Sequence, residues 1–195
     1  MTVYSVMDVA NYFIDYFKKS VDPMTVPRLQ MFLYYAQAEC LARHNRPLFM
    51  DEIRAYPNGP AVTRIYAYFD GAGNEQITST YGSYSVSKFD DVDRNLLLDV
   101  AVFYNQFSTG QLQIMSYHTG GPWAETHGTY GDKLAAIDPS AIKEYFLRRP
   151  RIPSHMDFML ATIELSKHND AVVVGAGPIV DNQKYPADSF TSSWE

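Results

Sequence analysis

Three ionisable side chains past the middle of the chain have the types that metal or acid–base chemistry requires. They are His118, Glu125 and His127. With His44 as a further ligand, they would suit a small metal-dependent hydrolase, because imidazoles and carboxylates bind metal ions and transfer protons. A helical metal motif places two histidines four residues apart on one face. Here the break at Gly120-Gly121-Pro122 separates them, so we favour structural roles and assign no catalytic or metal-ligating residue.

The remaining sequence offers no motif for a nucleophile or a phosphate. Cys40 is the single cysteine, so an internal disulfide and a cysteine-based zinc cluster are both excluded. It falls in an apolar helical stripe and is expected to be a buried, inert thiol. The run Gly71-Ala72-Gly73-Asn74 follows a predicted helix, whereas a dinucleotide-binding loop follows a strand and opens a helix. We therefore expect a protein that is not an enzyme and needs no cofactor.

The composition fits a soluble domain with an acidic surface. The chain has 195 residues, 46% hydrophobic and 14% aromatic, and a net charge of −6. Because phosphate contacts dominate nucleic-acid affinity, this charge disfavours DNA or RNA as a partner. A DNA-binding helix-turn-helix regulator is the second alternative, but the basic helix face that it requires is not seen. No apolar run reaches the ~20 residues of a membrane-spanning helix, so a cytoplasmic protein is predicted.

Apolar residues recur at helical spacing along most of the chain. The spacing predicts helices over residues 4–19, 25–44, 60–69, 90–107, 108–118 and 154–165, with another from Asp138 towards Pro150. Residues 48–56 are expected to be extended, and residues 77–89 to form a loop with a short hairpin. The predicted fold is mainly α, a compact multi-helix bundle with at most a small β-hairpin and a C-terminal extension. A helical domain is expected over residues 1–150, and a helix with a Gly/Pro/Ser-rich tail over residues 151–195.

The predicted helix over residues 25–44 carries unusually many aromatic residues. Its inner stripe consists of Leu29, Phe32, Leu33, Ala36 and Cys40. This stripe suffices for a place in the core, which leaves Tyr34, Tyr35 and Gln37 to be explained. Tyrosine combines an apolar ring with a polar edge and suits interaction surfaces. These three residues are therefore the candidate contacts with a partner.

An ordered series of short motifs runs through three quarters of the chain. The motifs are Val9-Ala10-Asn11-Tyr12-Phe13, Leu29-Gln30-x-x-Leu33-Tyr34-Tyr35-Ala36-Gln37, Pro47-Leu48-Phe49, Gly59-Pro60-x-Val62 with Tyr66 and Phe69, and Leu112-x-x-x-Ser116-x-His118 with Pro122-Trp123. Together they resemble the Panacea domain, an antitoxin-associated, phage-associated GepA-like family that includes the proteolytic adaptor SocA. The chain departs from the family at Ala38-Glu39, where Gly-Trp is usual, and at residues 56–60, where Trp-x-Tyr-Gly-Pro is usual.

The resemblance implies a non-enzymatic, mostly helical domain that neutralises a co-encoded toxin by binding it. In the adaptor branch, such a domain also hands a toxin to a protease, so the implied partners are a cognate toxin and a protease. The match gives as signature positions Gln30, Tyr34, Gln37, Gly59, Pro60, His118 and Trp123. Their expected roles are architectural: Gly59 and Pro60 would start a helix, and Trp123 would fill space beside a helix end. The oligomeric state is left open.

Overall fold

Helices make up most of the part of this chain that the structure describes. A computed structural model gives its structure and describes residues 2–20 and 23–168. The described part contains α1 (Val6–Phe17), α2 (Val26–His44), β1 (Ile53–Tyr56), β2 (Gly59–Val62), α3 (Thr63–Tyr68), α4 (Asp91–Tyr104), α5 (Thr109–Ser116), α6 (Pro122–Tyr130), α7 (Pro139–Arg148) and α8 (His155–His168), with short 3₁₀ turns η1 (Val86–Lys88) and η2 (Gly131–Lys133). The predicted class, a mainly α bundle with one small hairpin, is confirmed.

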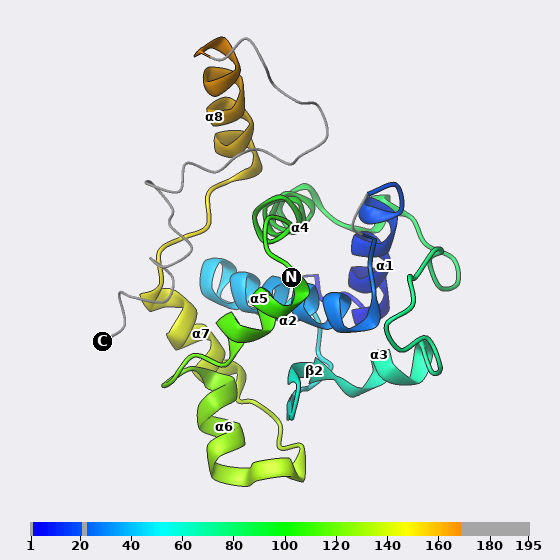
Figure 1. Ribbon diagram of the computed structural model, residues 1–195, viewed down its shortest axis with the longest axis vertical. Coiled ribbons are helices and arrows are strands. Elements are labelled where there is room, and N and C mark those ends of the chain that lie inside the picture. Colours follow the sequence, from blue (N-terminus) through cyan, green and yellow to red (C-terminus); the bar gives the residue numbers. More distant parts are fainter. Residues whose placement is uncertain (1, 21–22, 169–195) are drawn as a thin grey trace.

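Helix α2 lies at the centre of the fold. Its N-cap is Thr25, where the predicted helix begins. The Thr25 Oγ1 accepts the Arg28 N–H at 3.4 Å, and Asn45 ends the helix in the left-handed conformation with φ 55°. Fifteen of its nineteen residues are buried, so the helix is covered on nearly every side. Figure 1 shows α1, α4, α5 and α7 arranged around it, and β2 packs against it as well. Most of the hydrophobic core therefore forms around this one helix.

The only sheet in the described part of the chain is the hairpin of β1 and β2. The strands pair antiparallel, with Tyr56 opposite Gly59 and Ala55 opposite Pro60. The Ala55 N–H points away from β2 and donates to the carbonyl of Ala135 at 2.9 Å. Ala55 and Pro60 therefore form a pair without hydrogen bonds between them, so a proline is tolerated there. The prediction that Gly59 and Pro60 start a helix is therefore wrong: they begin β2, and α3 starts at Thr63.

Two further segments differ from the prediction. Residues 77–89 contain no strand and form a loop that includes η1. Ile77 ties this loop to the residues just before α2, because its N–H donates to the carbonyl of Met24 at 2.8 Å. The Gly-Gly-Pro run ends one helix, as predicted, but Pro122 then opens α6, which the prediction missed. Proline suits this first helical position because an N–H there has no intrahelical partner.

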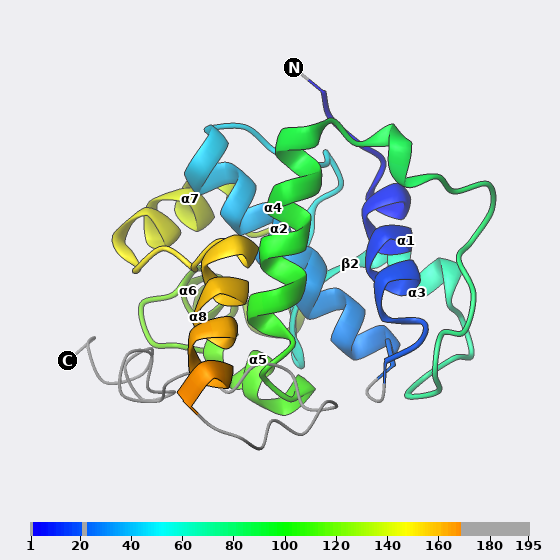
Figure 2. The same cartoon turned by 90° about the horizontal axis from the view of Figure 1, so that it is seen from above.

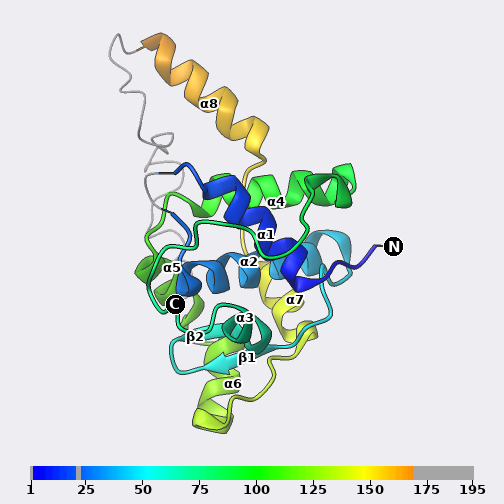
Figure 3. The same ribbon diagram turned by 90° about the vertical axis from the view of Figure 1, so that its right-hand side faces the viewer.

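Helix α8 projects from the rest of the molecule. Figure 3 shows it at the opposite end from α6 and the hairpin, and Figure 2 shows it beside α4. Phe158 is its buried contact with the core. The predicted tail, with its possible strand over residues 172–174, lies outside the described residues, and the division near residue 150 stays a prediction. No helix in the described part of the chain is long and apolar enough to cross a membrane.

Candidate functional site

The signature residue Gln37 fastens an extended segment of chain to α2. Its Oε1 accepts the N–H groups of Leu48 (2.8 Å) and Phe49 (3.2 Å), and its Nε2 donates to the Phe49 carbonyl at 3.0 Å. On the other side of the segment, Tyr4 donates its N–H to the Leu48 carbonyl at 2.9 Å. The Gln37 amide thus takes the place of a second strand and satisfies backbone groups that would otherwise be buried without partners.

Gln30 does the same for the hairpin. Its Oε1 accepts the Val62 N–H at 2.8 Å, and its Nε2 donates to the Val62 carbonyl at 3.1 Å. Gln30 precedes Gln37 by two helical turns, so both amides project from one face of α2. Each of the two signature glutamines therefore holds a non-helical segment against the central helix.

The placement of Tyr34, Tyr35 and Gln37 corrects the idea that they contact a partner. Their exposed fractions are 2%, 0% and 4%, so none of them offers a surface in this fold. Tyr35 stacks on Tyr104 with ring centroids 4.1 Å apart and donates its hydroxyl to the Leu112 carbonyl at 2.8 Å. Burial raises the pKa of Tyr34 and Tyr35 well above the usual range. These side chains join helices in the core.

Gly59 and Trp123 fix the hairpin against α5 and α6. Gly59 has φ 115°, which other residues rarely adopt, and a Cβ there would lie only 3.3 Å from Met31 Cε. Both the backbone conformation and the limited space therefore favour glycine. The Trp123 Nε1 donates to the Tyr56 carbonyl at 2.9 Å, and its ring stacks on that of His127 with centroids 4.7 Å apart. Trp123 therefore fastens the turn end of the hairpin to α6.

The hydrolase candidates are not assembled into a metal site. His118 follows α5 and lies near the ring of Tyr145, His127 is stacked on Trp123, and Glu125 is exposed. Among the described residues, the group that has metal-ligand geometry is instead Cys40, His44 and Asp93.

This second group is better described as a buried ion pair. Arg46 donates from Nη2 to both carboxylate oxygens of Asp93, at 2.5 and 2.7 Å, and so competes with any cation for them. His44 Nδ1 lies 3.5 Å from the same carboxylate. Burial raises the pKa of Cys40 to about 12, which disfavours the thiolate that a metal would need.

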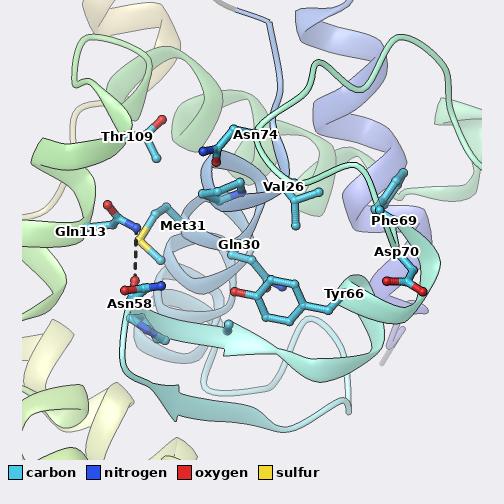
Figure 4. A pocket seen from close by; sticks show the side chains of 15 residues that line it. Val26, Gln30, Met31, Asn58, Tyr66, Phe69, Asp70, Asn74, Thr109 and Gln113 are labelled. Carbon is cyan, nitrogen blue, oxygen red and sulfur yellow. Dashed lines mark hydrogen bonds between the residues drawn. The ribbon is translucent and has the colours of Figure 1, made fainter.

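A groove lies where the start of α2 meets β2, α3 and α5. Its volume is about 460 Å³, within the range of roughly 300–1,000 Å³ typical of ligand sites. Figure 4 shows Val26, Gln30 and Met31 of α2 behind it and Tyr66 of α3 in front. We call this hollow the α2–α3 groove. Sequence reasoning did not find it, although the signature residues Gln30 and Pro60 line it.

The two ends of the α2–α3 groove differ in chemistry. One end carries Phe69 and Asp70, and the other carries Asn58, Thr109 and Gln113. At the second end, Gln113 Nε2 donates to the Asn58 carbonyl at 3.2 Å, which ties α5 to the hairpin turn. The middle combines the apolar side chains of Val26 and Met31 with the polar side chains of Gln30 and Asn74. The groove is therefore a concave surface of mixed polarity with an acidic end and an amide end.

Fold and site together define a small helical domain in which signature amides hold the chain together beside an open groove. Residues 29–124 match the family model described as antitoxin SocA-like, Panacea domain, so this part of the chain belongs to the Panacea family. The resemblance drawn from the motifs is thereby confirmed. No curated protein and no solved structure matches the chain. An antitoxin-like family implies a protein partner.

Proposed function

We propose that this chain is an antitoxin-like protein that binds a co-encoded toxin and neutralises it. The observation that carries the proposal is the Panacea family match over residues 29–124. The proposal includes a cytoplasmic location, because the toxin of a neighbouring gene would be made and act there. It also includes an adaptor step, in which the bound toxin is handed to a protease.

Charge and shape support binding as the mode of action. The net charge of −6 complements a basic partner, and many toxins act on RNA and therefore carry basic surfaces. The α2–α3 groove lies within the matched segment, apart from Val26 and Pro27 at its edge. Interfaces concentrate their binding energy in a few buried anchors, for which such a groove is suited.

The two alternative functions receive less support. A metal-dependent hydrolase would need His118, Glu125 and His127 to converge, and the described structure does not bring them together. A helix-turn-helix regulator would need a basic helix to enter the major groove. The short helices α5 and α6 carry no lysine or arginine.

Growth of cells that express the neighbouring gene tests the proposal. We expect that gene's product alone to arrest growth and co-expression of this chain to restore it, because binding removes the active toxin. A frameshifted copy of the chain's gene is the matched control, since its transcript is made without the protein.

The same cells separate neutralisation from the adaptor step. A toxin half-life that is shortened by the chain would support transfer to a protease, whereas an unchanged half-life would contradict it. Absence of rescue, together with failure of the two proteins to co-purify, would contradict the proposed function as a whole.

A further inference from the structure

The acidic end of the α2–α3 groove indicates the chemistry of its occupant. Among the described residues that line the groove, Asp70 is the only charged one. The nearby cation of α3, Arg64, pairs instead with Asp51, with Nη1 3.2 Å from Oδ1. Asp70 is exposed at one end of the groove, in a chain of net charge −6. A cationic side chain is therefore the electrostatic complement of this end.

Aromatic rings next to Asp70 favour the same occupant. Phe69 shares its end of the groove, and Tyr66, which is 38% exposed, forms the front wall. A lysine or arginine over such rings gains a cation–π interaction, and its aliphatic stem packs on apolar surface. Val26 and Met31, in the middle of the groove, suit an apolar side chain that precedes the cation.

The backbone around the groove disfavours the addition of a partner strand. The outer edge of β2 is the only strand edge there, and Gln30 already occupies both backbone groups of Val62. Pro60 has no N–H to offer. Recognition in the groove therefore depends on side chains and not on β-sheet extension.

We propose that the α2–α3 groove binds a short segment of a partner protein in which apolar residues precede a lysine or arginine, with the cation paired to Asp70. This inference rests on the proposed function, because it names the surface through which the toxin would be held. The amide end, with Gln113 and Asn58, receives the opposite end of the segment through hydrogen bonds to its backbone.

Binding of the neighbouring gene's product to the full chain, measured by calorimetry, tests the groove. Tyr66→Ala and Asp70→Lys are each expected to weaken binding by about tenfold or more, because each removes or reverses an anchor. Tyr81→Ala and Glu144→Lys are the matched controls: Tyr81 is an exposed tyrosine and Glu144 an exposed carboxylate, and neither lines the groove. Thermal melting checks that all four variants stay folded.

A second measurement probes the groove without the toxin. The peptides acetyl-Leu-Leu-Arg-amide and acetyl-Leu-Leu-Gln-amide are titrated into the isotopically labelled chain, and the amide signals of Gln30, Asn74 and Gln113 are followed. The arginine peptide is expected to shift these signals at least about threefold more effectively than the glutamine peptide, and Asp70→Asn is expected to abolish the difference.

The outcomes separate the two proposals. Toxin binding that is equal in the wild type and in the Tyr66 and Asp70 variants would overturn the groove and leave the antitoxin function standing. Absence of toxin binding to the wild type would overturn the proposed function. The comparison of the arginine and glutamine peptides would then test the groove proposal independently of the toxin. A dimer of the free chain that Tyr66→Ala converts to a monomer would show a second copy in the groove, which would also overturn the inference.

Discussion

At the scale of single residues, the signature positions Gln30 and Gln37 of this chain fasten backbone segments to α2. Gln30 and Gln37 each use both ends of one amide to satisfy the backbone of a non-helical segment, on the side that faces α2 and has no strand. Leucine or methionine would fit the same helix face but would leave those buried backbone groups without partners. The physical need is therefore for a side chain with both a donor and an acceptor.

Replacement of Gln37 by leucine is expected to lower the free energy of unfolding by about 2–4 kcal/mol. The change leaves the N–H groups of Leu48 and Phe49 and one carbonyl without their partner, and each unsatisfied buried group costs about 1–3 kcal/mol, reduced where water enters. Urea unfolding measures the loss. Gln76→Leu, at an exposed position, is the control, and equal effects of the two changes would contradict the fastener role.

The N-cap of α4 predicts a pH dependence. The Asp93 N–H donates to Asp90 Oδ1 at 2.9 Å, and this bond is the main cause that holds the pKa of Asp90 below its ordinary value of 3.8. A carboxyl group whose pKa is lower in the folded state than in the unfolded state stabilises the fold at any pH above its unfolded-state pKa. This stabilisation is lost as the pH falls through the folded-state pKa. Asp90→Ala should therefore cost about 1 kcal/mol at neutral pH and less in strong acid.

Urea unfolding of the Asp90→Ala variant and the wild type at pH 7 and in acid checks this. Asp91→Ala serves as the control, because the side chain of Asp91 is 84% exposed on the same helix and does not cap it. A stability difference for Asp90→Ala that is the same at both pH values would show that the carboxylate charge has no part in the cap.

At the scale of elements, most helices follow from local pattern, whereas the exceptions depend on distant partners. Thr25, Ser108 and Asp138 are N-caps at the positions where the predicted helices begin. Gly59 and Pro60 have the local chemistry of a helix start, and only the pairing with β1 and the Gln30 amide shows that they belong to a strand. Likewise, tyrosine is a residue type that suits a surface, and Tyr34 and Tyr35 are buried only because α4 and α7 pack against them.

The groove could not be predicted from the sequence for the same reason. It is formed by the start of α2, by α3 and by Gln113 of α5, which lie far apart along the chain. No local pattern shows that these segments meet. The signature positions Gln30 and Pro60 were the available signal, because they mark where the hairpin joins α2.

The attachment of α8 gives a prediction at this scale. Asp99 of α4 accepts the His155 N–H at 2.7 Å through Oδ1 and an Arg43 N–H at 2.9 Å through Oδ2. Arg43 also donates to the Ile152 carbonyl at 3.3 Å. Asp99→Ala should therefore release the start of α8 while the helices around α2 stay folded.

Hydrogen exchange of the backbone amides measures this release. Exchange over residues 152–158 is expected to rise at least about tenfold in Asp99→Ala, with little change in α2, because local opening need not unfold the core. Asp91→Ala is again the control on α4. Uniform acceleration throughout the chain would show that Asp99 supports the whole fold and not this one attachment.

At the scale of the whole molecule, a single buried helix organises an acidic domain whose described surface includes a groove with one charged end. The family match covers residues 29–124, whereas α8 lies beyond it and is attached through Asp99 and Arg43 of the matched segment. The helix α8 is therefore an addition to the matched segment, held by charged contacts to α4 and α2. The proposed function depends on the matched segment, and the further inference depends on its groove.

The central claim is that this chain acts by binding a toxin, and the mass of the complex in solution tests it most directly. The chain and the product of the neighbouring gene are purified separately, mixed, and measured by light scattering during gel filtration. We predict one peak with the summed mass of the two proteins, and its loss when Asp70→Lys replaces the wild type. Two separate peaks from the wild-type proteins, at concentrations well above those in a cell, would contradict the claim.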